Sequence, residues 1–456
     1  MKQDKTRISS AQLIPLSFLA AILIGALLLM LPFATAPGEH TDFLTAFFTA
    51  TTSVCVTGLV VVDSFAHWTL FGKIIILILI QLGGLGIITV TSALMLFIHK
   101  KFSLRHSLLI HDAFNLTSTR GLVRFLRRVL QGTFVVEGLG ALLYMTVFIP
   151  RFGFVEGVWQ SIFTAISAFC NAGIDILGPD SLIPYRSNPT VLIVTMLLIV
   201  LGGLGYMVWF DTILTAKNGV RNHYSPITVL RRLNEHTKLV LVLTGSLILL
   251  GAVLIFVFEY NNPETLGPMT LGGKILNSLF QSVTFRTAGF ATVPQQALRS
   301  SSALLGCLLM FIGGSPVGTA GGVKTVVFFV ILVNLMSFIQ DRDQTVIFKR
   351  RVSDDLVRKA NAIVTVCFLV ICILMITLVS LENVGVIDGL YEVVSAVGTV
   401  GLSRALTPSL HTAGRILIII GMYLGRIGPI SMALFFNTGS KNGNSISVAE
   451  GKFIVG

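Results

Sequence analysis

One short stretch of the sequence, 48-FTATTSVCVTG-58, occurs in four versions along the chain. The other three are 163-FTAISAFCNAG-173, 279-LFQSVTFRTAG-289 and 391-YEVVSAVGTVG-401. They align without gaps, their final glycines are spaced almost evenly, and a bulky apolar residue follows each glycine. A motif that returns at a fixed period predicts an architecture built from repeated units.

Each stretch closes a segment that is too short to cross a bilayer. The helix-forming residues of these segments begin at Phe43, Val158, Leu276 and Leu390. Roughly a dozen residues precede each glycine, whereas a span needs about 20. Irregular backbone at membrane depth is tolerated only where it lines a cavity or is buried in protein. The segments are therefore predicted to be re-entrant half-helices.

A second glycine-rich motif keeps the same period inside the apolar helix that follows each half-helix. Its four versions are 83-GGLG-86, 202-GGLG-205, 313-GGSP-316 and 425-GRIG-428. Small residues are common where membrane helices pack closely. Helix packing is thus one explanation of this motif, and a functional role is the other.

The composition predicts a membrane protein. Of the 456 residues, 54% are hydrophobic and 12% are charged, about half the roughly 25% charge of a soluble domain. The net charge of +12 comes from Lys and Arg clustered between apolar runs, so it indicates topology and not nucleic-acid binding. The positive-inside rule places both termini and three linkers in the cytoplasm. The five cysteines have no metal-ligand spacing.

The predicted fold is an all-α membrane protein with four tandem helix / re-entrant pore-helix / helix repeats. They stand in a pseudo-fourfold arrangement around one central pore, with eight spanning helices plus four pore half-helices. The predicted repeats are 1–101, 102–222, 223–341 and 342–456, and the last includes a short cytoplasmic C-terminus.

The second span of repeat three is abnormal. Residues 303–339 would make a helix of roughly 55 Å at 1.5 Å per residue, against a hydrocarbon core of about 30 Å. Five glycines and Pro316 lie between residues 313 and 322, and proline alone costs a helix about 3 kcal/mol. A broken helix with an irregular loop at membrane depth is predicted, either as a functional element or as a passive kink.

This arrangement suits a cation. A selective pore must replace the hydration shell with oxygen ligands, which backbone carbonyls can supply. Half-helices whose C-terminal ends converge add the negative ends of their dipoles. Glycine permits the backbone angles that aim carbonyls inward.

The four glycine-terminated repeats and the interrupted helix together resemble the Trk/Ktr/HKT superfamily of potassium transporters, most of all the membrane subunits of bacterial Ktr systems. The resemblance implies that the filter strands, with potassium at their carbonyls, are Val56-Thr57-Gly58, Asn171-Ala172-Gly173, Thr287-Ala288-Gly289 and Thr399-Val400-Gly401. Glycine in all four strands goes with potassium in this superfamily, although three strands depart from Thr-Val-Gly.

The resemblance also implies a gate beneath the filter. Its loop would comprise Gly313, Gly314, Ser315, Pro316, Val317, Gly318, Thr319, Ala320, Gly321 and Gly322, and Arg426 would hydrogen-bond to it. An intramembrane charge is costly and suggests function. The alternative is a packing arginine satisfied by carbonyls.

Three further charged residues need explanations. Arg286 lies beside a cation filter, so it is predicted to pair with an acid such as Glu392. Lys324 ends a stretch similar to a phosphate-binding loop, but Val323 stands where that motif needs glycine. Nucleotide binding is therefore rejected there, and a cytoplasmic-facing pairing role is expected. For Glu137, a buried hydrogen bond and a place in the ion pathway both stay open.

The predicted function is potassium-selective uptake, channel-like and driven by the membrane potential. A sodium-coupled potassium symporter is the alternative, and sodium as an activator stays open beside it. No enzyme constellation and no cofactor are expected. The resemblance implies a homodimer in the bacterial cytoplasmic membrane and a cytoplasmic RCK-type nucleotide-binding ring (KtrA-like). The lipid bilayer is the other expected partner, and no nucleic acid is.

Overall fold

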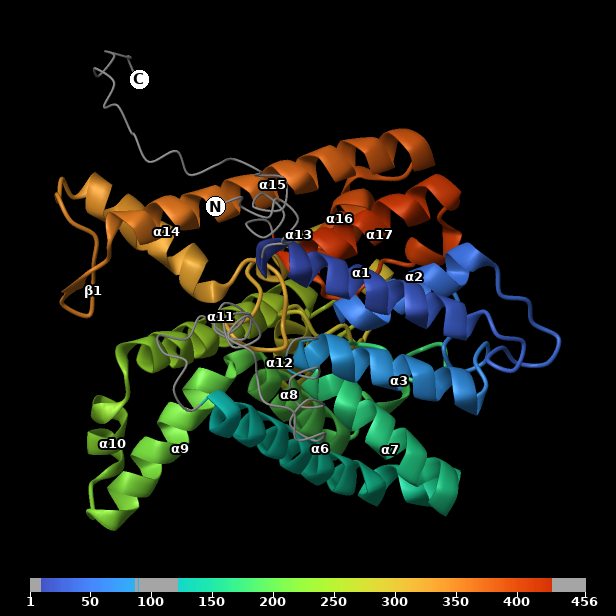
Figure 1. Ribbon diagram of the computed structural model, residues 1–456, viewed down its shortest axis with the longest axis horizontal. Coiled ribbons are helices and arrows are strands. Elements are labelled where there is room, and N and C mark those ends of the chain that lie inside the picture. The colour runs from blue at the N-terminus through green and yellow to red at the C-terminus, as the bar shows by residue number, and fades with distance from the viewer. Residues whose placement is uncertain (1–9, 87–88, 90–121, 429–456) are drawn as a thin grey trace, which may run out of the picture.

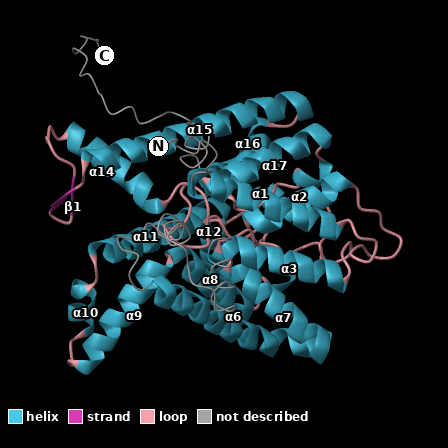
Figure 2. Cartoon of the chain, viewed as in Figure 1, coloured by secondary structure: helices cyan, strands magenta, loops and turns pink. Residues whose placement is uncertain are grey.

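The computed structural model describes residues 10–86, 89 and 122–428 of a mainly helical chain (Figures 1 and 2). Several predictions concern residues outside these ranges. They are the boundary between repeats one and two, the cytoplasmic placement of the linker at that boundary, and the cytoplasmic placement of both chain ends. The described part begins with α1 and ends with α17.

The helices are given below by predicted repeat, and the repeat boundaries stay a prediction. Repeat one contains α1 (Ser10–Leu29), α2 (Phe43–Cys55) and α3 (Leu70–Leu85). Repeat two contains α6 (Leu122–Phe152), α7 (Phe154–Phe169), the 3-10 turn η1 (Ile183–Tyr185), α8 (Pro189–Leu204) and α9 (Tyr206–Arg221). Repeat three contains α10 (Pro226–Arg232), α11 (Glu235–Glu259), α12 (Leu271–Thr284), η2 (Gln295–Ala297), α13 (Ser300–Phe311) and α14 (Thr325–Ile339). Repeat four contains β1 (Val346–Ile347), β2 (Arg350–Arg351), α15 (Asp354–Glu382), α16 (Val386–Gly398), η3 (Thr407–Ser409) and α17 (Thr412–Ile427).

Each group has a short helix that ends just before one of the four repeated glycines. These half-helices are α2, α7, α12 and α16. Local caps set their starts: Asp42 Oδ1 accepts from Thr45 N at 3.2 Å, and Thr270 Oγ1 accepts from Gly273 N at 3.3 Å, as expected for N-caps. Except for α2, they begin a few residues earlier than predicted.

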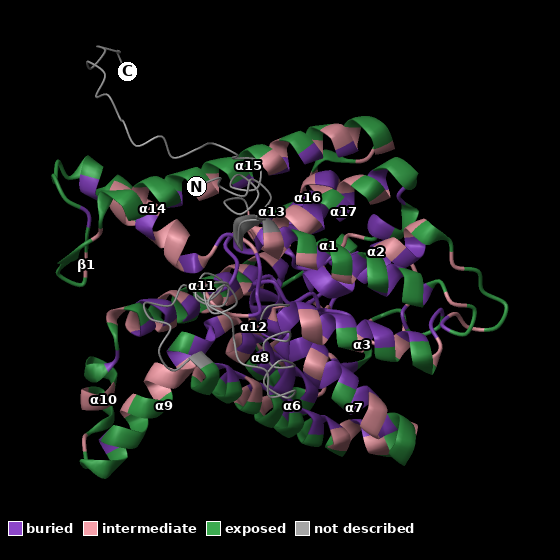
Figure 3. Ribbon diagram, in the orientation of Figure 1, coloured by how far each residue is buried: buried purple, intermediate pink, exposed green. Residues whose placement is uncertain are grey.

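Long apolar helices form much of the outside of the molecule (Figure 3). By length and composition, three described helices could cross a membrane: Val123–Phe152, Glu235–Glu259 and Asp354–Glu382. A fourth results if α8 and α9 count as one span despite a 99° bend between them. Leu249 and Ile376 are 64% and 68% exposed, which suits a lipid surrounding. The full number of eight spans stays a prediction.

The second glycine motif ends a helix in every repeat. Gly86, Gly205 and Gly428 follow α3, α8 and α17 with φ values of 83°, 88° and 86°, and α13 ends at Phe311, just before Gly313. A positive φ strains any residue with a side chain. A helix break was predicted for repeat three, and α8 and α9 of repeat two are also separated, at Gly205.

The same motif packs against the half-helix of its own repeat, which supports the packing explanation as well. A Cβ on Gly83, Gly202 or Gly425 would collide with the carbonyl oxygen of Val54, Phe169 or Val397, respectively. Each of these carbonyls precedes the repeated glycine of its repeat by four positions. Repeat three departs from this pattern, because there Gly313 contacts Gly321 of its own loop.

Each half-helix packs against its neighbours in the chain or in space: α2 against α1 and α3, α7 against α6 and α8, α12 against α11 and α8, and α16 against α15 and α17. In the view of Figure 1, α9, α10 and β1 stand at the left end, and the connections that follow α1 and α2 stand at the right. Residues 312–324, called the central loop below, connect α13 to α14 and contain the predicted gating segment 313–322. Ile312 and Val323 form a parallel bridge across its base.

Candidate functional site

The four turns after the half-helices share one backbone conformation. The residue two positions before each glycine has a positive φ: Val56 55°, Asn171 58°, Thr287 64° and Thr399 49°. The glycines themselves have φ values of 101°, 64°, 84° and 94° for Gly58, Gly173, Gly289 and Gly401. Non-glycine residues rarely adopt this region. Its occurrence at the matching position of all four repeated stretches indicates a shared structural role.

The glycines meet at one place, called the glycine ring below. A Cβ on Gly58 would lie 2.5 Å from Ala172 O, one on Gly173 would lie 2.6 Å from Ala288 O, and one on Gly289 would lie 2.6 Å from Val400 O. A Cβ on Gly401 would collide with Thr57 O, so the fourth repeat is in contact with the first. Each repeat therefore faces the carbonyl of the next, and a methyl group at any of the four positions has no room.

Polar atoms without protein partners gather at these turns. Among the described residues, the hydroxyls of Thr57, Thr287 and Thr399 and Nδ2 of Asn171 are buried and have no hydrogen-bond partner. Buried polar groups ordinarily have partners. Hydroxyl and carbonyl oxygens at a narrow point are the ligand type that a hard monovalent cation prefers.

A cavity of about 350 Å³ opens on one side of the glycine ring, and all four ring glycines line it. Two of its lining residues are acidic, Asp63 and Asp175, and none is Lys or Arg. Asp175 accepts from Ser181 Oγ at 2.7 Å and from Leu177 N at 3.2 Å. Burial nevertheless raises the pKa of the Asp175 carboxyl to about 6. The cavity, called the vestibule below, therefore favours cations at neutral pH.

The central loop is bound to repeat two on the other side of the turns. Ser315 N and Thr319 N donate to Gly203 O and Gly202 O at 3.0 and 3.1 Å, and Tyr206 N donates to Val317 O at 3.1 Å. These contacts use backbone groups that the break between α8 and α9 leaves free. The break between α8 and α9 thus supplies the backbone groups that bind the central loop.

The loop also contacts the turn residues directly. Thr319 Oγ1 donates to Asn171 Oδ1 and to Phe169 O, both at 3.1 Å. A Cβ on Gly321 would collide with Thr399 Oγ1. The predicted gate residues therefore lie against predicted filter residues of repeats two and four.

Arg426 joins the loop to repeat one. Its Nη1 donates to Thr319 O at 2.6 Å, and its Nη2 donates to Gly83 O. The hydrogen bond to the loop was predicted from the family resemblance, and the carbonyl partners of the packing alternative are present too. The same guanidinium therefore binds the loop carbonyl and a carbonyl of a neighbouring helix.

The prediction that Arg286 pairs with Glu392 is wrong. Arg286 donates to Gly313 O at 3.1 Å and to Thr244 O at 3.5 Å. Glu392 instead accepts from Ser403 Oγ at 2.8 Å and from Thr407 Oγ1. Glu392 is occupied by the outer loop of its own repeat, while Arg286 holds the start of the central loop.

The other two charged residues are also satisfied locally. Lys324 Nζ donates to Ala320 O at 2.6 Å. Its hydrogen-bond partner is thus a backbone carbonyl and not the carboxylate that a pairing role implies. Glu137 accepts two hydrogen bonds from Gln81 Nε2, at 3.1 and 3.2 Å. This geometry favours the buried-hydrogen-bond explanation for Glu137.

Sequence reasoning missed several residues of the site. Asp175 belongs to none of the motifs, although its position two residues after Gly173 could have placed it in the vestibule. Gly205 was seen only as a motif member. The contacts of Arg286 with the central loop carried no local signal, because its partners come from other helices.

Comparison with known proteins gives a consistent result. Residues 4–447 match the TrkH family, described as a cation transport protein. The chain is 35% identical to Ktr system potassium uptake protein B of Bacillus subtilis over 96% of both chains. It is also 35% identical to potassium/sodium uptake protein NtpJ of Enterococcus hirae, over 94% of this chain and 93% of the relative. The crystal structure of the potassium transporter TrkH from Vibrio parahaemolyticus superposes with a TM-score of 0.72 at 15% identity, covering 96% of this chain and 87% of that one.

Proposed function

Because the chain belongs to the TrkH family of cation transport proteins, we propose that it is the ion-translocating membrane subunit of a potassium-uptake system of the Ktr type. The names of its relatives support potassium as the transported ion. The observation that carries the proposal is the glycine ring, in which four turns of matching conformation meet under an acidic vestibule.

The proposed mechanism needs no chemical step. Cations collect in the vestibule beside Asp63 and Asp175 and lose part of their hydration shell at the ring. Backbone carbonyls and the buried hydroxyls of Thr57, Thr287 and Thr399 replace the lost water. The C-terminal ends of α2, α7, α12 and α16 add negative potential there. A membrane potential supplies about 2.3 kcal/mol per charge per 100 mV.

The central loop is the proposed gate. It is attached by hydrogen bonds to repeat two and to Arg426, and it lies directly against Asn171 and Thr399. Glycine, serine and threonine make up much of the loop, so its backbone can change conformation at low cost. Movement of the loop away from the turns would open the pathway.

Sodium coupling is the second candidate function. The relative named potassium/sodium uptake protein NtpJ favours a role for sodium. Sodium could act as a transported ion or as an activator of potassium flux. A symporter would have midplane carboxylates or discontinuous helices in paired inverted halves. Here the predicted repeats are parallel and not inverted, and Glu137 and Glu392 are both occupied by neighbouring side chains.

The proposal extends to the assembly. Relatives named as parts of a Ktr system support a complex with further subunits. We propose a homodimer in the bacterial cytoplasmic membrane that binds a cytoplasmic RCK-type nucleotide-binding ring. Basic residues on α9 and α10, such as Arg221 and Arg232, offer a surface for it.

Flux measurements test the function. The purified chain is placed in proteoliposomes, and potassium and sodium uptake are followed with and without an imposed potential. We expect potassium uptake that increases with an inside-negative potential. Equal uptake of the two ions would refute potassium selectivity. Potassium uptake that requires sodium on the same side would favour the symporter.

A further inference from the structure

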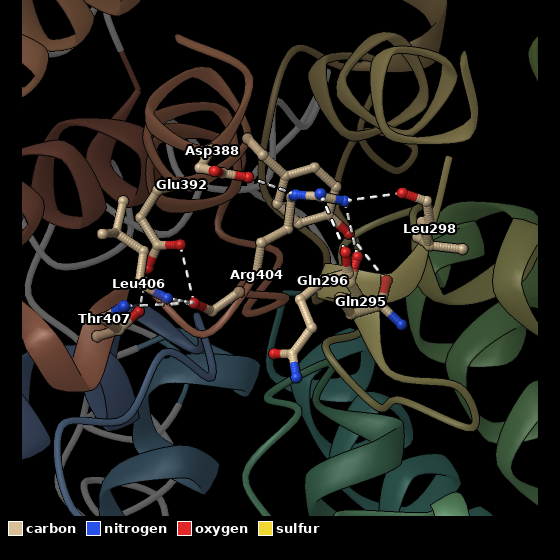
Figure 4. Close-up of polar contacts among 10 residues, drawn as sticks. Gln295, Gln296, Leu298, Asp388, Glu392, Arg404, Leu406 and Thr407 are labelled. Atoms are coloured by element: carbon tan, nitrogen blue, oxygen red, sulfur yellow. Dashed lines mark hydrogen bonds and ion pairs between the residues drawn. The ribbon is translucent and has the colours of Figure 1, made fainter. Parts of the chain in front are cut away.

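Arg404 lies in the outer loop three residues after Gly401, and its side chain is only 12% exposed. Its guanidinium uses all three nitrogens (Figure 4). The acceptors are Asp388 Oδ1 at 2.6 Å from Nε, Gln295 O at 2.8 Å and Leu298 O at 3.3 Å from Nη1, and Gln296 O at 3.1 Å from Nη2. An arginine with little exposed surface and this many acceptors is held in one position.

The acceptors belong to two different repeats. Asp388 is in the first turn of α16, the half-helix of repeat four. The three carbonyls lie at η2, in the outer loop of repeat three. Arg404 therefore bridges repeats three and four at the level of the vestibule.

A second layer of hydrogen bonds supports this bridge. Tyr391 OH, on α16, donates to Gln295 Oε1 at 2.9 Å. Gln281 Nε2, on α12, donates to the same oxygen at 2.7 Å. These side chains are buried, so the two half-helices are connected behind the turns that follow them.

The bridge is continuous with the glycine ring. Ser403, next to Arg404, donates to Glu392 Oε2 at 2.8 Å, and Ser403 and Gln295 both line the vestibule. Only one short segment, residues 402–403, separates the clamped arginine from Gly401. Displacement of Arg404 would be transmitted to the position of the fourth turn.

Charge adds a second reason for the pair. An unneutralised guanidinium at the entrance of a cation pathway would repel cations, and Asp388 at 2.6 Å neutralises it. Arg404 is not among the residues that line the vestibule. The charged group thus has a structural role. The planar guanidinium presents its N–H groups in a fixed arrangement and binds several acceptors that lysine cannot bind together.

We propose that Arg404 is a positioning residue for ion selection: it clamps the outer end of the fourth turn to repeat three and so fixes the geometry of the glycine ring. This inference rests on the proposed function. Ion discrimination requires ligand positions that do not relax around a smaller ion, and a clamp between repeats opposes such relaxation.

Arg415 provides a matched control. It is an arginine of the same repeat, at the start of α17, and it also donates to outer-loop carbonyls. Its acceptors are Leu410 O at 2.9 Å and Pro408 O at 3.5 Å, both within repeat four. It therefore has the same chemistry without the bridge to repeat three.

The experiment compares initial potassium and sodium uptake in proteoliposomes for the unmodified full chain, Arg404→Gln, Arg404→Lys and Arg415→Gln. We expect both Arg404 variants to lower the potassium/sodium ratio by about tenfold, equivalent to about 1.4 kcal/mol. Arg404→Lys keeps the positive charge but not the planar guanidinium. A fall of the potassium/sodium ratio in this variant therefore shows that the hydrogen-bond geometry matters and not the charge alone. Arg415→Gln should keep the ratio.

Other outcomes would overturn the inference. A normal ratio in Arg404→Gln, or in Arg404→Lys, would exclude the clamp. If Arg404→Gln does not yield folded protein, Asp388→Asn tests the same bridge more mildly, and an unchanged ratio there would count against it. Absence of potassium uptake by the unmodified chain would instead refute the proposed function on which the inference rests.

Discussion

At the scale of single residues, the turns before the glycine ring carry backbone strain. Val56, Asn171, Thr287 and Thr399 all have φ near the left-handed region, which costs an L-residue roughly 1–2 kcal/mol. Valine and threonine are β-branched, and asparagine tolerates this region best. Strain of this kind persists only where the surroundings fix it, and it is common at functional sites. Here each strained residue is buried.

Arg426 is the residue whose removal should increase transport. In Arg426→Ala, the loop loses the hydrogen bond to Thr319 O and the pathway loses a positive charge. A hydrogen bond to a charged group contributes about 1.5–3 kcal/mol, so we expect potassium uptake to rise by about tenfold or more. The two acceptors of Arg426, Thr319 O and Gly83 O, lie outside the glycine ring, and the potassium/sodium ratio should therefore persist. Initial uptake rates in proteoliposomes measure both.

Arg415→Ala, in the same helix, is the control for Arg426→Ala and should leave the rate unchanged. Unchanged uptake in Arg426→Ala would remove this arginine from the gate. A raised rate with equal uptake of sodium and potassium would show that it supports the filter and not only the loop.

At the scale of elements, the break between α8 and α9 is a structural feature in its own right. Gly205 ends α8 and precedes α9, and the two helices meet at 99°. The broken hydrogen-bond pattern leaves Gly202 O, Gly203 O and Tyr206 N free, and the central loop occupies all three. Repeat two is shaped to receive the loop of repeat three.

Gly205→Ala should loosen this contact. Alanine at φ 88° costs roughly 1–2 kcal/mol, and its Cβ would collide with Pro316 O. We expect a lower thermal unfolding temperature and faster potassium uptake, because the loop is displaced from its binding site. Thermal unfolding in detergent and uptake in proteoliposomes measure the two effects.

Gly245→Ala is the matched substitution, since a Cβ there meets no atom within 4 Å beyond the nearby backbone of its own helix and the residue is inside α11. It should stabilise the protein by about 0.5–1 kcal/mol. Equal stability of Gly205→Ala and the unmodified chain would contradict the role assigned to the break.

At the scale of the whole molecule, the site combines cyclic order and asymmetry. The glycine ring passes from repeat one to two, three, four and back to one. On the vestibule side, however, Arg404 connects only repeats three and four. On the loop side, Arg426 and repeat two hold a segment contributed by repeat three. In the proposed mechanism, ion selection thus uses four corresponding positions, and gating uses positions that occur once.

The vestibule predicts a pH dependence of uptake. The Asp175 carboxyl, with its pKa raised from 3.8 to about 6, is ionised above pH 6 and takes up a proton as the outer pH falls through 6. The neighbouring Asp63 and Tyr185 interact with it electrostatically. Loss of one negative charge lowers the local cation concentration, so uptake should fall a few-fold between pH 7.5 and about pH 5.

Asp175→Asn should remove this dependence and hold uptake near the low-pH rate throughout. Initial uptake rates measured against outer pH test this for the unmodified chain and for Asp175→Asn. A full pH response in Asp175→Asn would assign the titration to another group. The same carboxyl binds its proton more tightly when folded, so its contribution to stability decreases as pH rises from about 4 to 6.

Several parts of this organisation could be read from sequence. The half-helices and their glycines were predicted from four stretches, 48–58, 163–173, 279–289 and 391–401. Such a prediction is possible because the length of a short helix and the need for a positive φ both depend on local residue type. Residues 313–322 gave the loop for the same reason. Helix starts such as Phe154 were displaced, since they depend on caps and on the preceding helix.

The sequence by itself determined the bilayer as solvent, the fourfold recurrence and the identity of the turns, because these follow from composition, period and local backbone preference. Only the tertiary structure decided what Arg286, Arg404 and the central loop bind. Arg286 finds Gly313 and not Glu392, and Arg404 finds carbonyls more than 100 positions away. A buried charge is satisfied by whichever acceptors the packed helices bring within about 3 Å, and that choice is not encoded in any local pattern.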